Sequence, residues 1–164
     1  MIVSLFIFSV VMVVSTGTLI SIIDANRKAQ SVKSVMNNVS FAVDSIARSL
    51  RVGTGYTAGA SGSCADSGAS ELSFTNVDGE TVEYRLSAGS IERRIATGPT
   101  AGGYLALTAP EVTIERFCFY VDGTGPSDGL QPRVLIIAGG TGGYGKTETV
   151  FNIQTLVSQR VLDR

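Results

Sequence analysis

A glycine-rich segment in the C-terminal third contains the strongest chemical motif of the sequence. Gly140-Thr141-Gly142-Gly143-Tyr144-Gly145-Lys146-Thr147 matches a phosphate-binding loop, in which backbone N–H groups and a lysine contact phosphates and a threonine hydroxyl binds Mg²⁺. Only 17 residues follow in this sequence, and they alternate like a strand instead of opening a helix. We therefore interpret Gly140, Gly145, Lys146 and Thr147 as part of a hairpin loop and expect no cofactor.

Carboxylates near a second turn could contribute to a calcium loop. Asp122 and Asp128 flank Gly-Thr-Gly-Pro-Ser, but Ca²⁺ takes about six or more oxygen ligands and only these two carboxylates are evident. A solvated turn is the favoured interpretation, and no metal site is predicted. The chain has no histidine, the commonest general base and metal ligand. We predict no catalytic site, and the protein is not expected to be an enzyme.

The chain has two cysteines, Cys64 and Cys118, too few for a cysteine-based zinc site. Both lie beyond the uncharged N-terminal segment. If that side is oxidising, a disulfide between them is the natural pairing. Two unpaired thiols, one of them buried in a strand, are the alternative. The net charge of −1, from 13 basic and 14 acidic residues, indicates no nucleic-acid partner.

No charged side chain occurs in residues 1–23. As a helix rising about 1.5 Å per residue, this segment is long enough to span the hydrocarbon core of a bilayer. A cleavable signal peptide is the alternative, but it would show a basic start, a shorter apolar core and a small-residue cleavage site. We therefore expect residues 1–23 to be the membrane or filament-core half of a helix.

The helical pattern continues from residue 24 to residue 52, with apolar residues every three or four positions at Ala25, Ala29, Val32, Met36, Val39, Val43, Ile46 and Leu50. The small side chains favour packing on a sheet over a coiled coil, with neighbouring helices as possible further partners. No proline interrupts residues 1–52, so one continuous helix is predicted. Gly53 is predicted to end it in a left-handed cap.

The remaining residues, 53–164, are predicted to form one antiparallel β domain, which gives the chain an α+β fold. Residues 53–70 read as a loop, and the glycine-rich connections are 98–103, 122–129 and 139–145. Asp78-Gly79 is a strong hairpin signal. Alternating or continuous apolar patterns predict strands at 71–77, 80–86, 90–95, 112–121, 133–138 and 149–157.

These features together resemble a type IV pilin or a type II secretion pseudopilin, most closely a minor pilin. Residues 2–12 look like the mature N-terminus of that family just after its glutamate. Similar segments in the domain are the hairpin 78–86, the strand entry Gln131-Pro132-Arg133 and the closing residues 154–160. The resemblance covers most of the chain and is most specific in the helix.

One departure from the family concerns the N-terminus. In the family a peptidase removes a basic leader ahead of a Phe-like residue, and a glutamate follows at the fifth mature position. Met1 stands where that glutamate is expected, so the sequence as given lacks the leader, the cleavage site and the glutamate. The family role of the glutamate, pairing with a neighbour's N-terminal amine, is therefore assigned to no residue.

The resemblance implies a structural subunit of a pilus or pseudopilus. Its expected partners are other pilin subunits, through the N-terminal helix, together with inner-membrane lipid and an assembly platform before polymerisation. The expected location is the bacterial inner membrane with an extracytoplasmic domain, and then an extracellular or periplasmic filament. The alternative function is a membrane-tethered extracytoplasmic binding domain that never polymerises.

Overall fold

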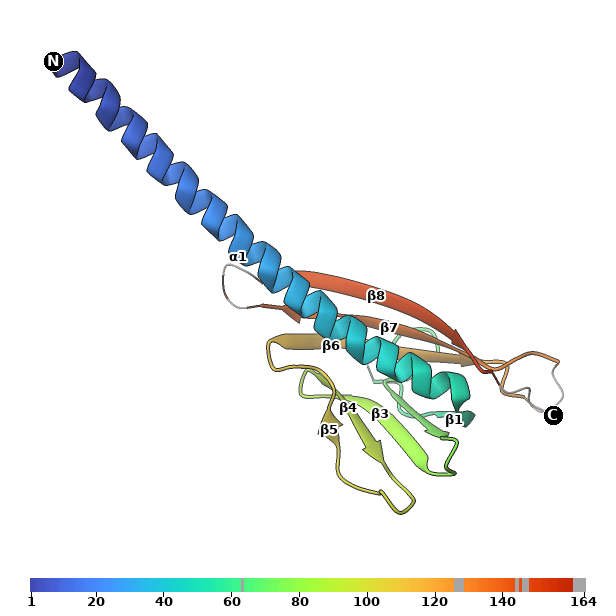
Figure 1. The fold of residues 1–164 in the computed structure, drawn as a ribbon. Coiled ribbons are helices and arrows are strands. Elements are labelled where there is room, and N and C mark those ends of the chain that lie inside the picture. The colour runs from blue at the N-terminus through green and yellow to red at the C-terminus, as the bar shows by residue number, and fades with distance from the viewer. Residues whose placement is uncertain (63, 126–128, 144, 146–147, 161–164) are drawn as a thin grey trace.

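A long N-terminal helix projects from a domain of antiparallel strands in the computed structural model (Figure 1). This helix, α1, spans Ile2–Val52, and its second half lies along one layer of strands. The structure describes residues 1–62, 64–125, 129–143, 145 and 148–160. The predicted α+β class is confirmed: the helix comes first in the chain and the strands follow it.

Eight strands follow α1 in the described part of the chain: β1 Thr54–Ala58, β2 Glu71–Thr75, β3 Thr81–Ser87, β4 Ser90–Ile95, β5 Leu105–Ala106, β6 Val112–Asp122, β7 Arg133–Gly142 and β8 Thr149–Ser158. The six predicted strands are all present. The largest difference is in β7, which continues through glycines that the sequence placed in a loop.

The predicted loop over residues 53–70 is wrong at its start, where β1 forms. β1 pairs with β2 through Thr57 opposite Ser73, and its register shifts between Thr54 and Thr57. Gly55 lies in that irregular stretch with φ of 65°, a left-handed conformation that suits glycine. β1 therefore forms by pairing with β2, in a segment whose composition is typical of a loop.

The buried face of α1 lies between Val35 and Leu50, and its buried residues are Val35, Val39, Ala42, Val43, Ile46, Ala47 and Leu50. The predicted place of Met36 in this face is wrong, because Met36 is 39% exposed and Val35 only 1%. Gly142 of β7 explains the difference. A Cβ atom at Gly142 would lie 2.5 Å from Cγ1 of Val35, so the missing side chain makes room for Val35.

Gly53 ends α1, but the predicted left-handed cap is wrong. Its φ of −79° and ψ of 163° are extended, and its N–H donates to the Leu50 carbonyl at 3.1 Å. A Cβ atom at this position would lie 2.3 Å from Cδ2 of Phe74. Glycine is needed here because the Phe74 ring of β2 packs directly against the end of the helix.

The described strands of the predicted antiparallel β domain form two sheets. The first has the order β1-β2-β3-β4-β5 and the second the order β6-β7-β8, with every pairing antiparallel. The sheets meet along β6, where Ala69 pairs with Phe119 and the Ile114 N–H donates to the Gly89 carbonyl at 2.8 Å. Both sheets and the second half of α1 contribute to one hydrophobic core.

Candidate functional site

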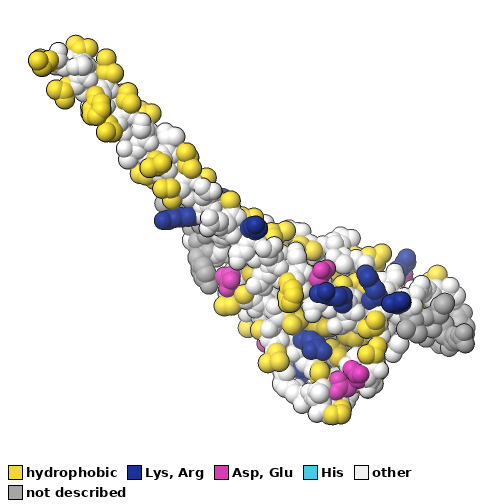
Figure 2. Space-filling view, in the orientation of Figure 1, with side chains coloured by type: hydrophobic (Ala, Val, Ile, Leu, Met, Phe, Trp, Pro, Cys, Tyr) yellow, Lys and Arg dark blue, Asp and Glu magenta, His cyan; other side chains and the backbone are white. Residues whose placement is uncertain are grey.

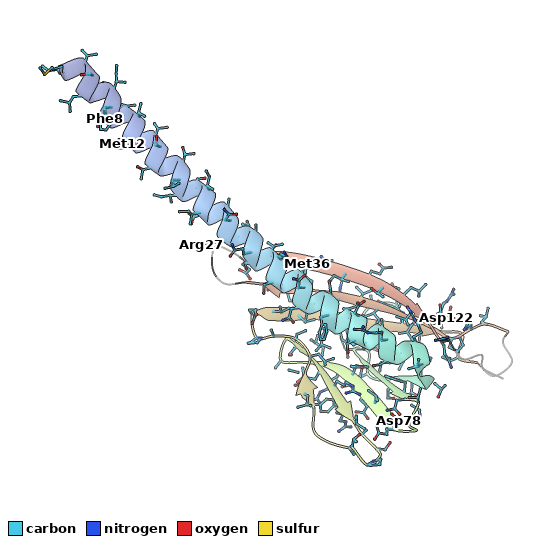
Figure 3. All side chains as sticks on the ribbon, in the orientation of Figure 1. Phe8, Met12, Arg27, Met36, Asp78 and Asp122 are labelled. Atoms are coloured by element: carbon cyan, nitrogen blue, oxygen red, sulfur yellow. A yellow bond between two sulfur atoms is a disulfide. The ribbon has the colours of Figure 1, made fainter. Side chains whose placement is uncertain are left out.

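The first half of α1 is an apolar surface that no part of the described domain covers. Its large apolar side chains are between 44% and 106% exposed: Met1, Ile2, Val3, Leu5, Phe6, Ile7, Phe8, Val10, Val11, Met12, Val13, Val14, Leu19, Ile20, Ile22 and Ile23. Figure 2 shows them as a yellow rod, and Figure 3 shows Phe8 and Met12 pointing away from the helix axis into solvent. An exposed apolar surface of this size marks a membrane or protein interaction site.

The dimensions of this half match a bilayer. Residues 2–23 rise about 33 Å as a helix, and the hydrocarbon core of a bilayer is about 30 Å thick. Among the described residues, α1 is the one helix long and apolar enough to span a membrane. The exposed charged residues Asp24, Arg27 and Lys28 follow within the next two turns, where lipid headgroups would begin (Figure 3 labels Arg27).

Hydroxyl side chains in the apolar half find acceptors within the helix itself. The hydroxyls of Thr16 and Thr18 donate to the carbonyls of Met12 and Val14 at 2.8 and 2.9 Å, and Ser4 donates to Met1 at 2.7 Å. Polar groups satisfied in this way can enter an apolar surrounding at little cost. The stretch around Gly17, where glycine and threonine lower the helix propensity, is helical in this isolated chain.

The domain holds the second half of α1 at both of its ends. Near the start, the Asn38 side-chain oxygen accepts a hydrogen bond from the Ala109 N–H at 3.1 Å. At the far end, the Tyr56 hydroxyl lies 2.9 Å from the Gly53 carbonyl oxygen, and burial raises the pKa of Tyr56 to about 12. Together with the buried face, these contacts make α1 and the domain one continuous body.

The disulfide between Cys64 and Cys118 is confirmed. Cys118 is buried on β6 between Phe117 and Phe119, whose rings lie in the core. Side chains alternate along a strand, so Cys118 points to the opposite face of the sheet. There the disulfide ties the connection between β1 and β2 to β6. Such a bond is typical of an oxidising, extracytoplasmic compartment.

Two glycines of the phosphate-loop motif, Gly140 and Gly142, have packing roles. Gly140 lies in β7, where a Cβ atom would come within 2.1 Å of the Thr113 carbonyl oxygen on β6. Gly145 has φ of 55°, and Lys146 and Thr147 lie outside the described residues. A phosphate-binding loop opens a helix, whereas the next element among the described residues is β8. The predicted loop at 139–145 is wrong for 139–142, which belong to β7.

Of the two calcium-loop candidates, Asp122 is the one that the structure describes. The Asp122 carboxylate accepts a hydrogen bond from Nε of Arg133 at 2.9 Å (Figure 3 labels Asp122), and this bond holds its pKa below the usual range. Asp128 lies outside the described residues. Over residues 1–62, 64–125, 129–143, 145 and 148–160, no three acidic, cysteine or histidine side chains gather as a metal site.

A charged cluster on the first sheet was not predicted from the sequence. Glu83 of β3 pairs with Nε of Arg94 of β4 at 2.6 Å, and Arg85 pairs with Glu92 at 2.8 Å. Tyr104 lies between the two arginines, whose guanidinium carbons are 3.5 and 4.6 Å from its ring centre. The register of the β3–β4 hairpin would have predicted both ion pairs, but no signal in the sequence places Tyr104 there.

This cluster borders a shallow depression of about 230 Å³. The hydrogen bond from Nε of Arg94 lowers the pKa of Glu83, and burial and the bond to Glu83 raise the pKa of Tyr104. The Tyr104 hydroxyl donates to Glu83 at 2.8 Å, and Arg85 and Arg94 each have a carboxylate partner. The cluster thus holds the segment that leads into the short strand β5 against the sheet.

No protein-family model matches this chain, and neither a curated protein nor a solved structure matches it. The resemblance to pilins therefore stays a prediction from the sequence, and the exposed apolar half of α1 is the feature that any function must explain.

Proposed function

We propose that this protein is a structural subunit, more specifically a minor one, of a type IV pilus or pseudopilus filament. Before assembly, residues 1–23 hold the subunit in the inner membrane with the disulfide-bonded domain on the extracytoplasmic side. During assembly the same residues leave the lipid and pack against the helices of other subunits. The proposed partners are those subunits, the membrane lipid and an assembly platform.

The observation that supports this proposal is the continuity of α1 from its exposed apolar half into its buried half. A membrane-tethered binding domain needs only a membrane segment and a linker, and that linker can be rigid or flexible. Here the domain is built on the same helix, through the buried residues from Val35 to Leu50. Packing the apolar half into a filament core would therefore set the orientation of each domain on the filament surface.

Lipid and a helical core offer this surface similar surroundings. Both are apolar, so the side chains of residues 1–23 can serve in either state, and helix association then depends on packing. Gly17 has no heavy atom within 4 Å of the place where its Cβ would be. Together with Thr16 and Thr18, it forms the stretch with the lowest helix propensity. We expect α1 to bend or unwind there in an assembled filament.

Surface shearing of the source cells tests the proposal. A filament subunit is expected in the sheared fraction together with partner subunits, whereas a tethered domain stays with the membrane. Cysteine introduced by Val11→Cys or Val14→Cys should give crosslinks between subunits in the sheared material. Phe41→Cys, on the solvent side of the domain half, is the matched control. Retention of all the protein in the membrane fraction would favour the tethered binding domain.

Mass spectrometry of the N-terminal peptide from the source membrane gives an independent test. A processed pilin should begin about four residues before Met1, with a methylated first residue that is followed by a glutamate ahead of Met1, as the resemblance implies. A native N-terminus at Met1 itself would count against pilin processing, and the tethered binding domain would become the better proposal.

A further inference from the structure

A short turn after the disulfide is tied to two adjacent residues of β6. At its start, Cys64 is bonded to Cys118. At its end, the Ala69 N–H donates to the Phe119 carbonyl and the Phe119 N–H donates to the Ala69 carbonyl, both at 2.8 Å. The segment before Ala69, residues 64–68, is described throughout, and we call it the clasp. Because Cys118 and Phe119 are consecutive, the chain must reverse its direction within the clasp.

This reversal requires an unfavourable backbone conformation. Asp66 and Ser67 have φ of 49° and 64°, which is left-handed although neither is glycine. A residue with a side chain adopts this conformation at a cost in free energy. Among the described non-glycine residues, Ala88 is the one other with a positive φ. The clasp is therefore a strained turn, and loss of either anchor on β6 would let it relax.

Few other contacts hold the clasp against the domain. Residues 65–67 are exposed, and Cys64 is half-buried. Gly68 is buried because it lies on the ring of Tyr120, where a Cβ atom would be 2.7 Å from Cζ. No residue of the clasp belongs to the hydrophobic core, which lies on the opposite face of β6. Breaking the disulfide would therefore free the clasp without removing a contact within the core.

The two sulfur atoms of the disulfide differ in their access to solvent. Cys118 is 1% exposed, whereas Cys64 is half-buried in a turn whose next residues are exposed. Thiol–disulfide exchange begins when a thiolate attacks one sulfur, and access decides which sulfur is attacked. Attack at Cys64 is therefore favoured, and it breaks the bond that ties the clasp to β6.

We propose that Sγ of Cys64 is a site of exchange with the dithiol of a thiol–disulfide oxidoreductase, and that the exchange releases the clasp while both sheets and α1 stay folded. The first thiolate of the dithiol bonds to Sγ of Cys64, and Cys118 leaves as a thiolate that takes a proton from water. The second thiolate of the dithiol then bonds to the first sulfur of its own molecule, and Cys64 leaves and is protonated. The dithiol is oxidised to a disulfide, and the two cysteines are reduced to thiols.

Release of the clasp would uncover Cys118. In the closed state the clasp lies over the outer face of β6, on which Cys118 and Tyr120 are neighbours. Once the clasp has moved away, the Cys118 thiol lies at the surface. Its reactivity after reduction therefore reports whether the clasp has opened. The inference involves none of residues 1–23, so it does not depend on the proposed filament.

The test uses the oxidised full chain in detergent micelles and two probes. Glutathione is a monothiol that marks the attacked sulfur, and peptide mass spectrometry should find its adduct on Cys64. Dithiothreitol is a dithiol that completes the reduction, after which iodoacetamide should alkylate Cys118 as readily as Cys64. Hydrogen exchange should become faster in residues 64–68 and stay unchanged in β7. Near-ultraviolet circular dichroism should show that the reduced domain is folded.

Variants separate the two anchors from the strain. In the double variant Cys64→Ser with Cys118→Ser, residues 64–68 should exchange fast without any reductant, and dithiothreitol should have no further effect. Ser67→Gly relieves a left-handed residue of the closed clasp, so the equilibrium constant for reduction by dithiothreitol should fall about threefold. Ala65→Gly is the matched control in the same turn. Its φ is not left-handed, so this change should not lower that constant.

Several results would overturn the inference. Reduction no faster than exchange of the core amides of β7 would show that the disulfide opens only when the whole domain unfolds. A glutathione adduct on Cys118 alone would show that the other sulfur is attacked. Protection of Cys118 from iodoacetamide after reduction would show that the clasp stays closed, and loss of the near-ultraviolet signal would show that the domain does not survive. The shearing experiment does not bear on any of these outcomes, so the two proposals fail separately.

Discussion

Replacing Gly140 by alanine should destabilise the domain far more than the same change at Gly145 or Gly103, which also lie in glycine-rich segments. The new Cβ would lie 2.1 Å from the Thr113 carbonyl oxygen and 2.9 Å from Cα of Ile114. Both are backbone atoms of β6, so no side-chain rotation can relieve the contact. The β6–β7 pairing must shift near the existing irregularity between Ile114 and Arg116.

The magnitude follows from this geometry. Overpacking a well-filled site costs about 1 to 3 kcal/mol, and a backbone clash belongs at the upper end, about 3 kcal/mol. For a chain of this size that corresponds to a fall in melting temperature of roughly 6 to 12 °C. Gly145→Ala should cost about 1 kcal/mol because φ is positive there. Gly103→Ala should cost little, since no atom lies within 4 Å of its added Cβ.

The assay is thermal unfolding of the full chain in a mild detergent, followed by near-ultraviolet circular dichroism. Adding Mg²⁺-ATP to the wild type serves as a second readout, because a nucleotide that binds the folded state raises its melting temperature. A Gly140→Ala variant as stable as Gly103→Ala would refute the packing role of this glycine. A clear stabilisation by ATP that Lys146→Ala abolishes would restore the phosphate-loop interpretation.

Three further predictions concern the charged cluster, the disulfide and the core. The pKa of Glu83 is lower in the folded protein than the ordinary glutamate pKa, so Glu83 stabilises the fold at pH values above that ordinary pKa. This stabilisation is lost as the pH falls through the pKa of Glu83 in the folded state. Tyr104→Phe should raise that pKa in an NMR titration and make stability less sensitive to acid; an unchanged titration would contradict the cluster. Cys118→Ala should cost about 4 kcal/mol in guanidinium unfolding, because it opens a loop with a sequence separation of 54, and an unchanged midpoint would argue against this. Ile46→Ala should cost about 2 to 5 kcal/mol and Phe41→Ala less than about 0.5 kcal/mol, since they are 0% and 69% exposed; equal losses would show that the buried face of α1 is wrong.

Most of the fold that could be predicted followed from the periodic spacing of apolar residues. An uninterrupted helical pattern predicted α1 to within a residue at each end, and alternation or apolar runs predicted six of the eight strands in the described residues. The pairing of Cys64 with Cys118 followed from there being two cysteines and an expected oxidising side. For the candidate site, the absence of charge in residues 1–23 was sufficient to identify the exposed apolar half of α1.

The features that were missed depend on which segments meet in space. β1 and β5 form because a neighbouring strand offers its edge, and their own sequences indicate loops. The sequence suggested that Gly53 and Gly140 are turn residues. In the structure, each position must be glycine because a Cβ atom there would clash with an atom of another element. The position of Tyr104 between two arginines likewise depends on how the segment after β4 returns to the sheet.

The packing of α1 along the length of the domain has a mechanical consequence. The buried residues from Val35 to Leu50 extend over about 24 Å of helix, nearly parallel to β8 (Figure 1). Tension applied along the helix loads all of these side chains in shear at the same time, and they must yield together. A sideways pull would instead separate them turn by turn. We therefore expect the protein to resist tension best along the axis of α1, the direction in which a membrane segment or the proposed filament would transmit load to it.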